Sequence, residues 1–194
     1  MLVVAALAAS AAARAGEQSR APGPWCGGQP WRLMTLADAQ RKLVHFDRIE
    51  TSVPDIAKLQ TPQVIGLRRN TNFQLHTWQV HATVDRYRIA SNGDIVLVLF
   101  DIPSGMYMDA YLPNPQCLGK DSRDRTGIVA ARDAFTQNCK PPATAQWQLL
   151  GASIDISGVG YWDAVRTTRG ELPNGAELRP VTNLSITAGC GVGG

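Results

Sequence analysis

The sequence lacks the short motifs that mark most catalytic and cofactor sites. It contains no GxSxG, no HExxH, no phosphate-binding loop and no dinucleotide fingerprint, and its four cysteines form no CxxC pair. The missing CxxC pairs argue against a zinc site made of four thiolates. Histidine is scarce too: His76 and His81 are five residues apart and would face opposite sides of a strand, and His45 is distant. The sequence therefore predicts no cofactor and no metal centre built on histidine or cysteine.

Charged residues are also few. They make up 18% of the chain, and the formal net charge is only +3. A dedicated binder of duplex DNA would show a stronger and more clustered basic excess. The low charge, together with 44% hydrophobic residues and five Trp, argues against disorder. At 194 residues the chain is long enough to bury one good core.

Long apolar runs are missing as well. Residues 1–15 read MLVVAALAASAAARA, a run too short and too rich in Ala to span a membrane. The A-x-A pattern at residues 13–15 is typical of a signal peptide, and residues 16–30 are rich in Gly, Pro and small polar residues, as in a flexible leader. We therefore expect an exported protein that is secreted, periplasmic or at the cell surface, with no membrane span in its mature form.

The four cysteines fit that compartment. An even number of cysteines in an exported chain indicates two disulfides, for which three pairings are possible. We favour Cys26–Cys190, which would tie the two ends of the chain, and Cys117–Cys139, which would bracket one helix.

Residues 73–112 carry the clearest structural pattern. Apolar and polar side chains alternate over residues 73–89, as in a half-buried strand. Residues 95–100 (IVLVLF) are apolar on both faces, as in a strand covered on both sides. Residues 91–94 (SNGD) and 102–105 (IPSG) are turn sequences. Two tight turns predict three neighbouring antiparallel strands, the third at residues 106–112.

The pattern changes after this meander. Residues 121–138 place apolar side chains at helical spacing and end before a Pro-Pro pair. Residues 146–162 and 177–186 have the composition of two further strands, and Gly151, Gly158 and Gly160 mark bends in the first of them. Five strands with one helix between the third and the fourth is the element order of the OB-fold.

The predicted fold class is therefore mainly β: a five-stranded, OB-fold-like Greek-key barrel at residues 73–187. Residues 31–72 have too few apolar side chains for a core of their own, so we expect an N-terminal extension packed on the barrel. Residues 188–194 are predicted to form a C-terminal tail.

Aromatic and basic side chains interleave along the predicted strands. Tyr107 and Tyr111 share one face of the third strand, and OB-folds that bind single strands combine stacking aromatics there with a cationic groove. A structural role stays open, because tyrosines with a solvated hydroxyl are ordinary on barrels. Glu177 and Arg179 likewise would either contact a polar ligand or form an ion pair that fixes the preceding loop. The candidate ligand-binding residues are Trp78, Arg88, Tyr107, Tyr111, Glu177 and Arg179.

Two short segments resemble the thermonuclease (staphylococcal nuclease-like) family of exported, calcium-dependent phosphodiesterases. Residues 92–94 (NGD) resemble its acidic turn before strand two, and residues 101–103 (DIP) resemble its Asp-x-Pro-Glu segment. The resemblance implies Asp94 and Asp101 as metal ligands. Position 104 is Ser where the family has Glu. We favour the alternative that Asp94 and Asp101 are turn residues bounding a strand.

A second resemblance covers most of the mature chain. Residues 158–163 (GVGYWD) and 173–181 (PNGAELRPV) resemble the ending of an uncharacterised family of bacterial exported proteins, and residues 92–101 resemble an earlier segment of it. That family implies no function.

These observations favour a non-enzymatic exported binding module. It would use one barrel face for a protein or an oligomeric ligand, with single-stranded nucleic acid as one such ligand. Two alternatives stay open: a thermonuclease-like, metal-dependent phosphodiesterase, and a structural subunit of an extracellular assembly.

Overall fold

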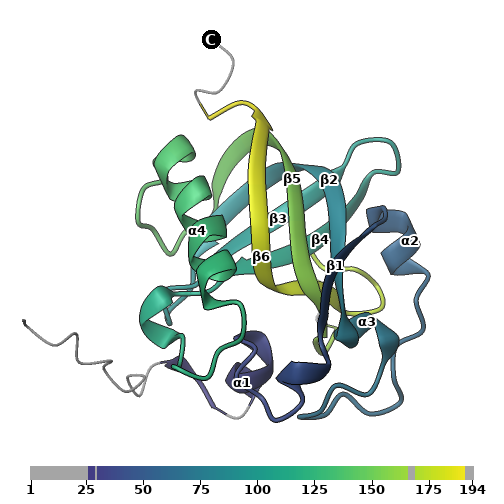
Figure 1. Cartoon of the computed structure of the whole chain (residues 1–194). Helices are drawn as coiled ribbons and strands as arrows, with labels where there is room; N and C mark the ends of the chain where they lie inside the picture. The colour runs from purple at the N-terminus through teal and green to yellow at the C-terminus, as the bar shows by residue number, and fades with distance from the viewer. Residues whose placement is uncertain (1–25, 29, 166–168, 191–194) are drawn as a thin grey trace, which may run out of the picture.

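The computed structural model describes residues 26–28, 30–165 and 169–190 (Figure 1). The predicted signal peptide, most of the predicted leader and residues 191–194 of the predicted tail lie outside the described residues.

Five strands form a closed ring of hydrogen bonds, in the order β2, β3, β4, β6, β5 and back to β2. The β4–β6 contact is parallel, at Ala110 and Leu178, and the other pairs in the ring are antiparallel. The predicted meander is therefore present, and the structure is a mainly β, barrel-like fold. The strands of the ring are β2 (His76–Ile89), β3 (Ile95–Asp101), β4 (Met106–Leu112), β5 (Gln148–Trp162) and β6 (Ala176–Ala188).

The alternation along β2 places its apolar side in the barrel, as predicted. Val80 and Val84 are buried in the core, but the ladder shifts register at Asp85. Such a bulge inserts one residue and changes the face on which later side chains lie. Beyond it, Tyr87 is in the core while Arg88 is exposed. The bulge therefore brings basic side chains to the outer face.

Both faces of β3 are buried, as its apolar run predicts. Leu97 and Leu99 belong to the core, while Val96 and Val98 are buried on the outer side. The loop between β5 and β6 covers part of that outer side, since Gly170 lies against Val98.

Glycines permit the close approach of neighbouring segments to β5. A Cβ atom on Gly158 would lie 2.9 Å from the Cβ of Leu178, and one on Gly160 would collide with the backbone of Phe73. The β5–β6 ladder shifts register at the same place. These glycines therefore mark irregularities in the strand, as predicted.

Helix α4 (Arg125–Cys139) lies between β4 and β5, close to its predicted position. It packs on β6 (Figure 1) and buries Ile128, Ala131 and Phe135. Asp124 caps the start of α4. Its carboxylate accepts a hydrogen bond from the backbone N–H of Gly127 at 3.3 Å, and the backbone of Asp124 is left-handed with φ of 53°.

Replacing Asp124 with Asn is expected to stabilise the protein more at about pH 6 than at about pH 3. Burial raises the pKa of Asp124 above its ordinary value of 3.8, against the opposing effects of the Gly127 N–H and of Arg123. The native state thus binds this proton more tightly than the unfolded chain, so the Asp contribution to stability falls as the pH rises through the folded pKa. Asn keeps the cap and tolerates the left-handed backbone but does not titrate. Urea unfolding of both proteins across this pH range tests the prediction. Asp124→Ala, which loses about 1 kcal/mol with the cap, is the control, and an Asn-minus-Asp difference that does not change with pH contradicts it.

The N-terminal region begins with short helices and turns. Helix α1 (Pro30–Met34) ends before Leu36, which has a left-handed backbone with φ of 54°. A single 3₁₀ turn, η2 (Arg41–Leu43), follows. The remaining short helices are α2 (Val53–Ala57), which the side chain of Ser52 caps, α3 (Asn72–Leu75) and the 3₁₀ turn η3 (Pro115–Cys117).

The extension also supplies a sixth strand. β1 (His45–Glu50) pairs in parallel with the first part of β2. The sheet therefore has six strands where the sequence predicted five, because residues 45–50 show neither a clear alternation nor an apolar run.

The predicted disulfide pairing is wrong. The bonds are Cys26–Cys117 and Cys139–Cys190, in place of Cys26–Cys190 and Cys117–Cys139. Cys117 lies in η3, before α4, whereas Cys139 is the last residue of α4, whose 15 residues extend over about 22 Å. Its packing on β6 instead brings Cys139 to the end of that strand, next to Cys190.

Two disulfides indicate an oxidising, extracellular environment. Within residues 26–28, 30–165 and 169–190, no helix has the length and apolar character needed to cross a membrane.

Candidate ligand-binding face

The outer surface of β2, β3, β4 and β6, with Trp147 just before β5, gathers arginine and aromatic side chains. We call it the arginine–aromatic face. Strand pairing sets Arg88 opposite Val96 and Val96 opposite Tyr111, and the neighbouring strand β6 carries Arg179. One row across the barrel thus runs from Trp147 through Arg88 and Tyr111 to Arg179.

Trp147 and Arg88 form the accessible end of this row. The guanidinium of Arg88 lies 4.7 Å from the centre of the indole ring and that of Arg86 lies 6.0 Å away, both within cation–π range. Trp147 remains 38% exposed, and Leu149 beside it is also exposed. A large indole held by arginines yet open to solvent is suited to stack on a planar group of a ligand.

Tyr107 lies at a second place on this face. Arg169, from the loop between β5 and β6, covers its ring at 4.9 Å and donates a hydrogen bond to its hydroxyl at 2.7 Å. Arg169 also lies 3.4 Å from Asp85, and the ring of Phe100 packs against Tyr107 at 4.7 Å. The ring of Tyr107 is therefore already stacked, while its partner Arg169 is half exposed.

Tyr111 is buried under a third arginine. Arg179 lies 3.9 Å from the Tyr111 ring and 5.9 Å from that of Tyr161, and it makes an ion pair with Asp94 at 3.4 Å. The side chain of Arg179 is only 11% exposed. This cluster links β6 to the β2–β3 turn. The alternative drawn from the sequence was an ion pair that fixes the loop before β6, whereas Arg179 pairs with Asp94 of the β2–β3 turn.

Arg132 of α4 also contacts the β2–β3 turn. It donates hydrogen bonds to the carbonyl oxygens of Leu112 at 2.8 Å and Gly93 at 2.9 Å. Burial lowers the pKa of Arg132, and Asp94 partly opposes this effect. The turn that borders the arginine–aromatic face is thus fixed in place by the helix.

Two of the predicted binding residues lie away from the exposed part of this face. Trp78 packs against the core and donates its indole N–H to the carbonyl of Phe73 at 2.9 Å. Glu177 is buried on β6, beside the loop that precedes the strand. Arg88, Tyr107, Tyr111 and Arg179 are brought onto the face.

Asp94 and Asp101 stand at opposite ends of β3, roughly 20 Å apart along the strand. Asp94 accepts hydrogen bonds from Asn92 and from the backbone N–H of Asn114 at 2.8 Å. Asp101 accepts one from the backbone N–H of Ser104 at 2.9 Å. A single cation cannot be bound by both, and each carboxylate has the contacts of a turn residue. Within the described residues, no three His, Cys, Asp or Glu side chains are grouped to hold a metal ion.

Sequence reasoning missed Trp147 and Arg169. Trp147 follows a polar segment and precedes its strand, and Arg169 lies in a loop. The available signal was the two arginines Arg86 and Arg88, which lie close together on one strand. Only the β2–β5 pairing shows that their aromatic partner is Trp147.

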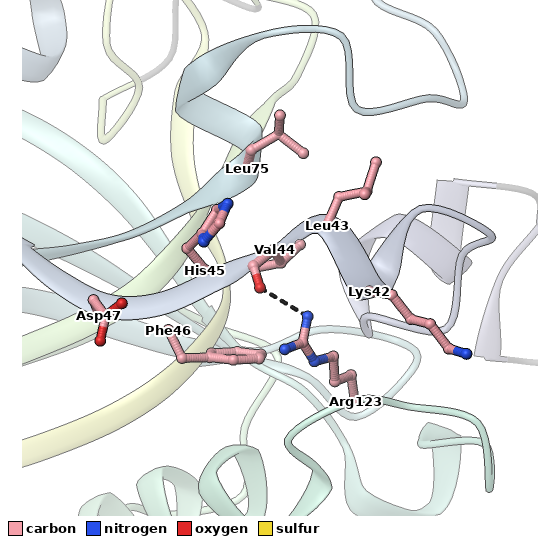
Figure 2. A pocket seen from close by; sticks show the side chains of 8 residues that line it. All are labelled: Lys42, Leu43, Val44, His45, Phe46, Asp47, Leu75 and Arg123. Carbon is pink, nitrogen blue, oxygen red and sulfur yellow. Dashed lines mark hydrogen bonds between the residues drawn. The ribbon is translucent and has the colours of Figure 1, made fainter.

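Apart from this face, a hollow with a volume of about 540 Å³ lies beside the start of β1. Figure 2 shows Arg123 reaching across it to the carbonyl of Val44, a hydrogen bond of 2.7 Å, with its guanidinium 4.7 Å from the Phe46 ring. Arg123 therefore holds the start of β1 and is not presented to a ligand. The residues that line the hollow are Lys42, Leu43, Val44, His45, Phe46, Asp47, Leu75 and Arg123.

No protein-family model matches the chain, and no curated protein matches it. Among solved structures, the chain is similar to an Entamoeba histolytica asparaginyl-tRNA synthetase in complex with asparaginyl-adenylate, with 13% sequence identity and a TM-score of 0.39. The match covers 73% of this chain and 24% of that chain. A likeness this weak supports no conclusion about function.

Proposed function

We infer that the protein is an exported binding module with an OB-type barrel, and that it takes an oligomeric ligand on the arginine–aromatic face. The observation that carries the proposal is Trp147, exposed to solvent and stacked with Arg88 beside Arg86. The two disulfides support the export.

The position of this face supports the proposal. OB-folds bind oligonucleotides and oligosaccharides on the surface of their second and third strands, between two loops. In this barrel the corresponding strands are β3 and β4, and the loops are the β2–β3 turn and the loop between β5 and β6. The arginine–aromatic face includes these strands, with Tyr107 and Tyr111 on β4 and Arg169 in the second loop, and extends from them to Arg88 on β2 and to Trp147.

The chemistry of the face favours a chain with planar groups and negative charge, of which single-stranded nucleic acid is the simplest probe. Stacking of a base on an aromatic ring contributes about 1–3 kcal/mol and tolerates any sequence. Arg86, Arg88 and Arg169 supply cations within the same area. Because Arg179 and Tyr111 are buried together, they support the face and do not contact the ligand.

The test is equilibrium binding of labelled single-stranded DNA and RNA of about ten nucleotides, the site-size range of one OB-fold. Trp147→Ala is expected to weaken binding about tenfold, and Arg88→Gln to reduce the slope of log affinity against log salt by about one. Val64→Ala and Arg68→Gln, at exposed positions outside the face, are the matched controls.

Three results are informative against the proposal. No binding of either strand removes nucleic acid as the ligand and favours a protein partner. Binding that is equally strong with Trp147→Ala places the site elsewhere. Calcium-dependent cleavage of the strands, abolished by a chelator, favours the phosphodiesterase alternative.

A further inference from the structure

We propose that two copies of this chain associate by antiparallel pairing of their β1 strands. This inference is independent of the proposed function, since no β1 residue belongs to the arginine–aromatic face.

β1 is an edge strand with little cover. Within the described part of the chain it pairs with β2 alone, and along its length only Phe46 is partly buried while the other residues are exposed. Ile49 is 36% exposed on a strand that lies along the near side of the barrel (Figure 1). An edge of this kind is a template for pairing with another strand.

The backbone of β1 has its free groups at known positions. Thr51 donates its backbone N–H to the carbonyl of Gln79 on β2, at 2.9 Å. Backbone groups alternate in direction along a strand. The N–H and C=O groups of Ile49 therefore also point to β2, whereas those of Arg48 and Glu50 point away from it. The bulge in β1 lies before Arg48 and leaves this part regular.

Among two-fold axes at residues 47–50, the charges select a single register. With the axis at residue 47, 48 or 50, a charged residue (Asp47, Arg48 or Glu50) would face the same residue of the second copy. Like charges directly opposite each other destabilise a strand pair. With the axis at Ile49, the two Ile49 side chains meet, and Arg48 of each copy faces Glu50 of the other.

This arrangement differs from the edges that proteins protect against pairing. Protected edges use charged residues, especially Lys, to disfavour a neighbouring strand. Arg48 and Glu50 have opposite signs, lie two residues apart and share a face, so they attract their counterparts in an antiparallel copy. They are also the residues whose free N–H and C=O groups would bond across the new ladder.

The experiment is sedimentation equilibrium of the full chain from about 1 to 300 µM, a range that spans weak self-association. The wild-type protein is expected to show a monomer–dimer equilibrium. Arg48→Glu and Glu50→Arg should each weaken the dimer at least tenfold, because each change creates two like-charged pairs. The double variant with both changes exchanges the charges and should restore the dimer to within about threefold of the wild type.

Lys120→Glu and Asp121→Arg are the matched controls, since both residues are exposed and lie outside β1. A protein that stays monomeric over the whole range overturns the proposal. A dimer insensitive to both single changes, or one that the double variant fails to restore, overturns it as well. Slow amide exchange at Arg48 and Glu50 at high protein concentration, becoming fast on dilution, supports it by a measurement that needs no variant.

Discussion

Replacing Arg69 with Met is expected to destabilise the fold by about 3–5 kcal/mol, the cost of leaving one partner of a buried ion pair alone. The side chain of Arg69 is fully buried and pairs with Asp38 at 2.8 Å. It also donates hydrogen bonds to the carbonyl oxygens of Leu33 at 2.8 Å and Gln74 at 3.1 Å. The substitution would leave a buried carboxylate without its cation and two carbonyl groups without their donor.

Arg69 joins two segments that are distant in the sequence: α1 with the turn after it, and the loop before α3 with α3 itself. Urea unfolding measures the loss, and Arg68→Met is the matched control, because Arg68 is the same residue type next in sequence and is exposed. Adding Asp38→Asn to Arg69→Met should recover part of the loss by removing the buried charge. A loss below about 1 kcal/mol, the usual size of a surface substitution, contradicts the prediction.

Periodicity predicted the parts of the fold that depend on neighbouring residues. The alternation in residues 76–84, the apolar run of β3 and the helical spacing in α4 each place side chains on a face that is buried. The turn at Asn92-Gly93 was also readable, and Gly93 has the expected positive φ of 82°. These features are local, so one sequence is enough to reveal them.

Features that depend on distant partners were not readable. β1 forms because it lies against β2, and its exposed side chains leave no periodic signal. The disulfide pairing was wrong because it follows from the packing of α4 on β6, which the order of cysteines along the chain does not contain. Nothing in the sequence marked Arg69 as buried, since its partners Leu33 and Asp38 are 36 and 31 residues away in sequence.

The candidate site shows the same division. Tyr107 and Tyr111 were placed on one face of a strand correctly, but arginines from β6 and from the β5–β6 loop cover both rings. Trp147 becomes an exposed aromatic beside Arg88 only through strand pairing and the bulge at Asp85. Residue types predicted the chemistry of the face, and topology decides which of its members a ligand can reach.

Removing the Cys26–Cys117 disulfide with Cys26→Ala and Cys117→Ala is expected to destabilise the protein by about 4–5 kcal/mol, from the chain entropy that the cross-link removes from the unfolded state. The two cysteines are 91 residues apart in sequence, against 51 for Cys139 and Cys190. The same relation gives about 4 kcal/mol for the second disulfide. Both double variants are measured by urea unfolding under oxidising conditions, and each serves as the control for the other.

Loss of the Cys26–Cys117 bond should also have the greater effect on local amide exchange, because the two disulfides join segments that differ in how well they pack on each other. Cys139 and Cys190 join α4 to β6, which pack on each other in any case. Cys26 joins the start of the described chain to η3, and α1, which follows Cys26, buries only Leu33 among its five residues, with Trp31 against Gly119. Without this bond, amides of α1 should exchange with solvent faster than those of the barrel, whereas loss of Cys139–Cys190 should leave α1 protected. A non-reducing peptide map of the wild-type protein decides whether the comparison is sound: a Cys26–Cys117 peptide is expected, and a Cys26–Cys190 peptide would contradict both the pairing and the predicted order of the two losses.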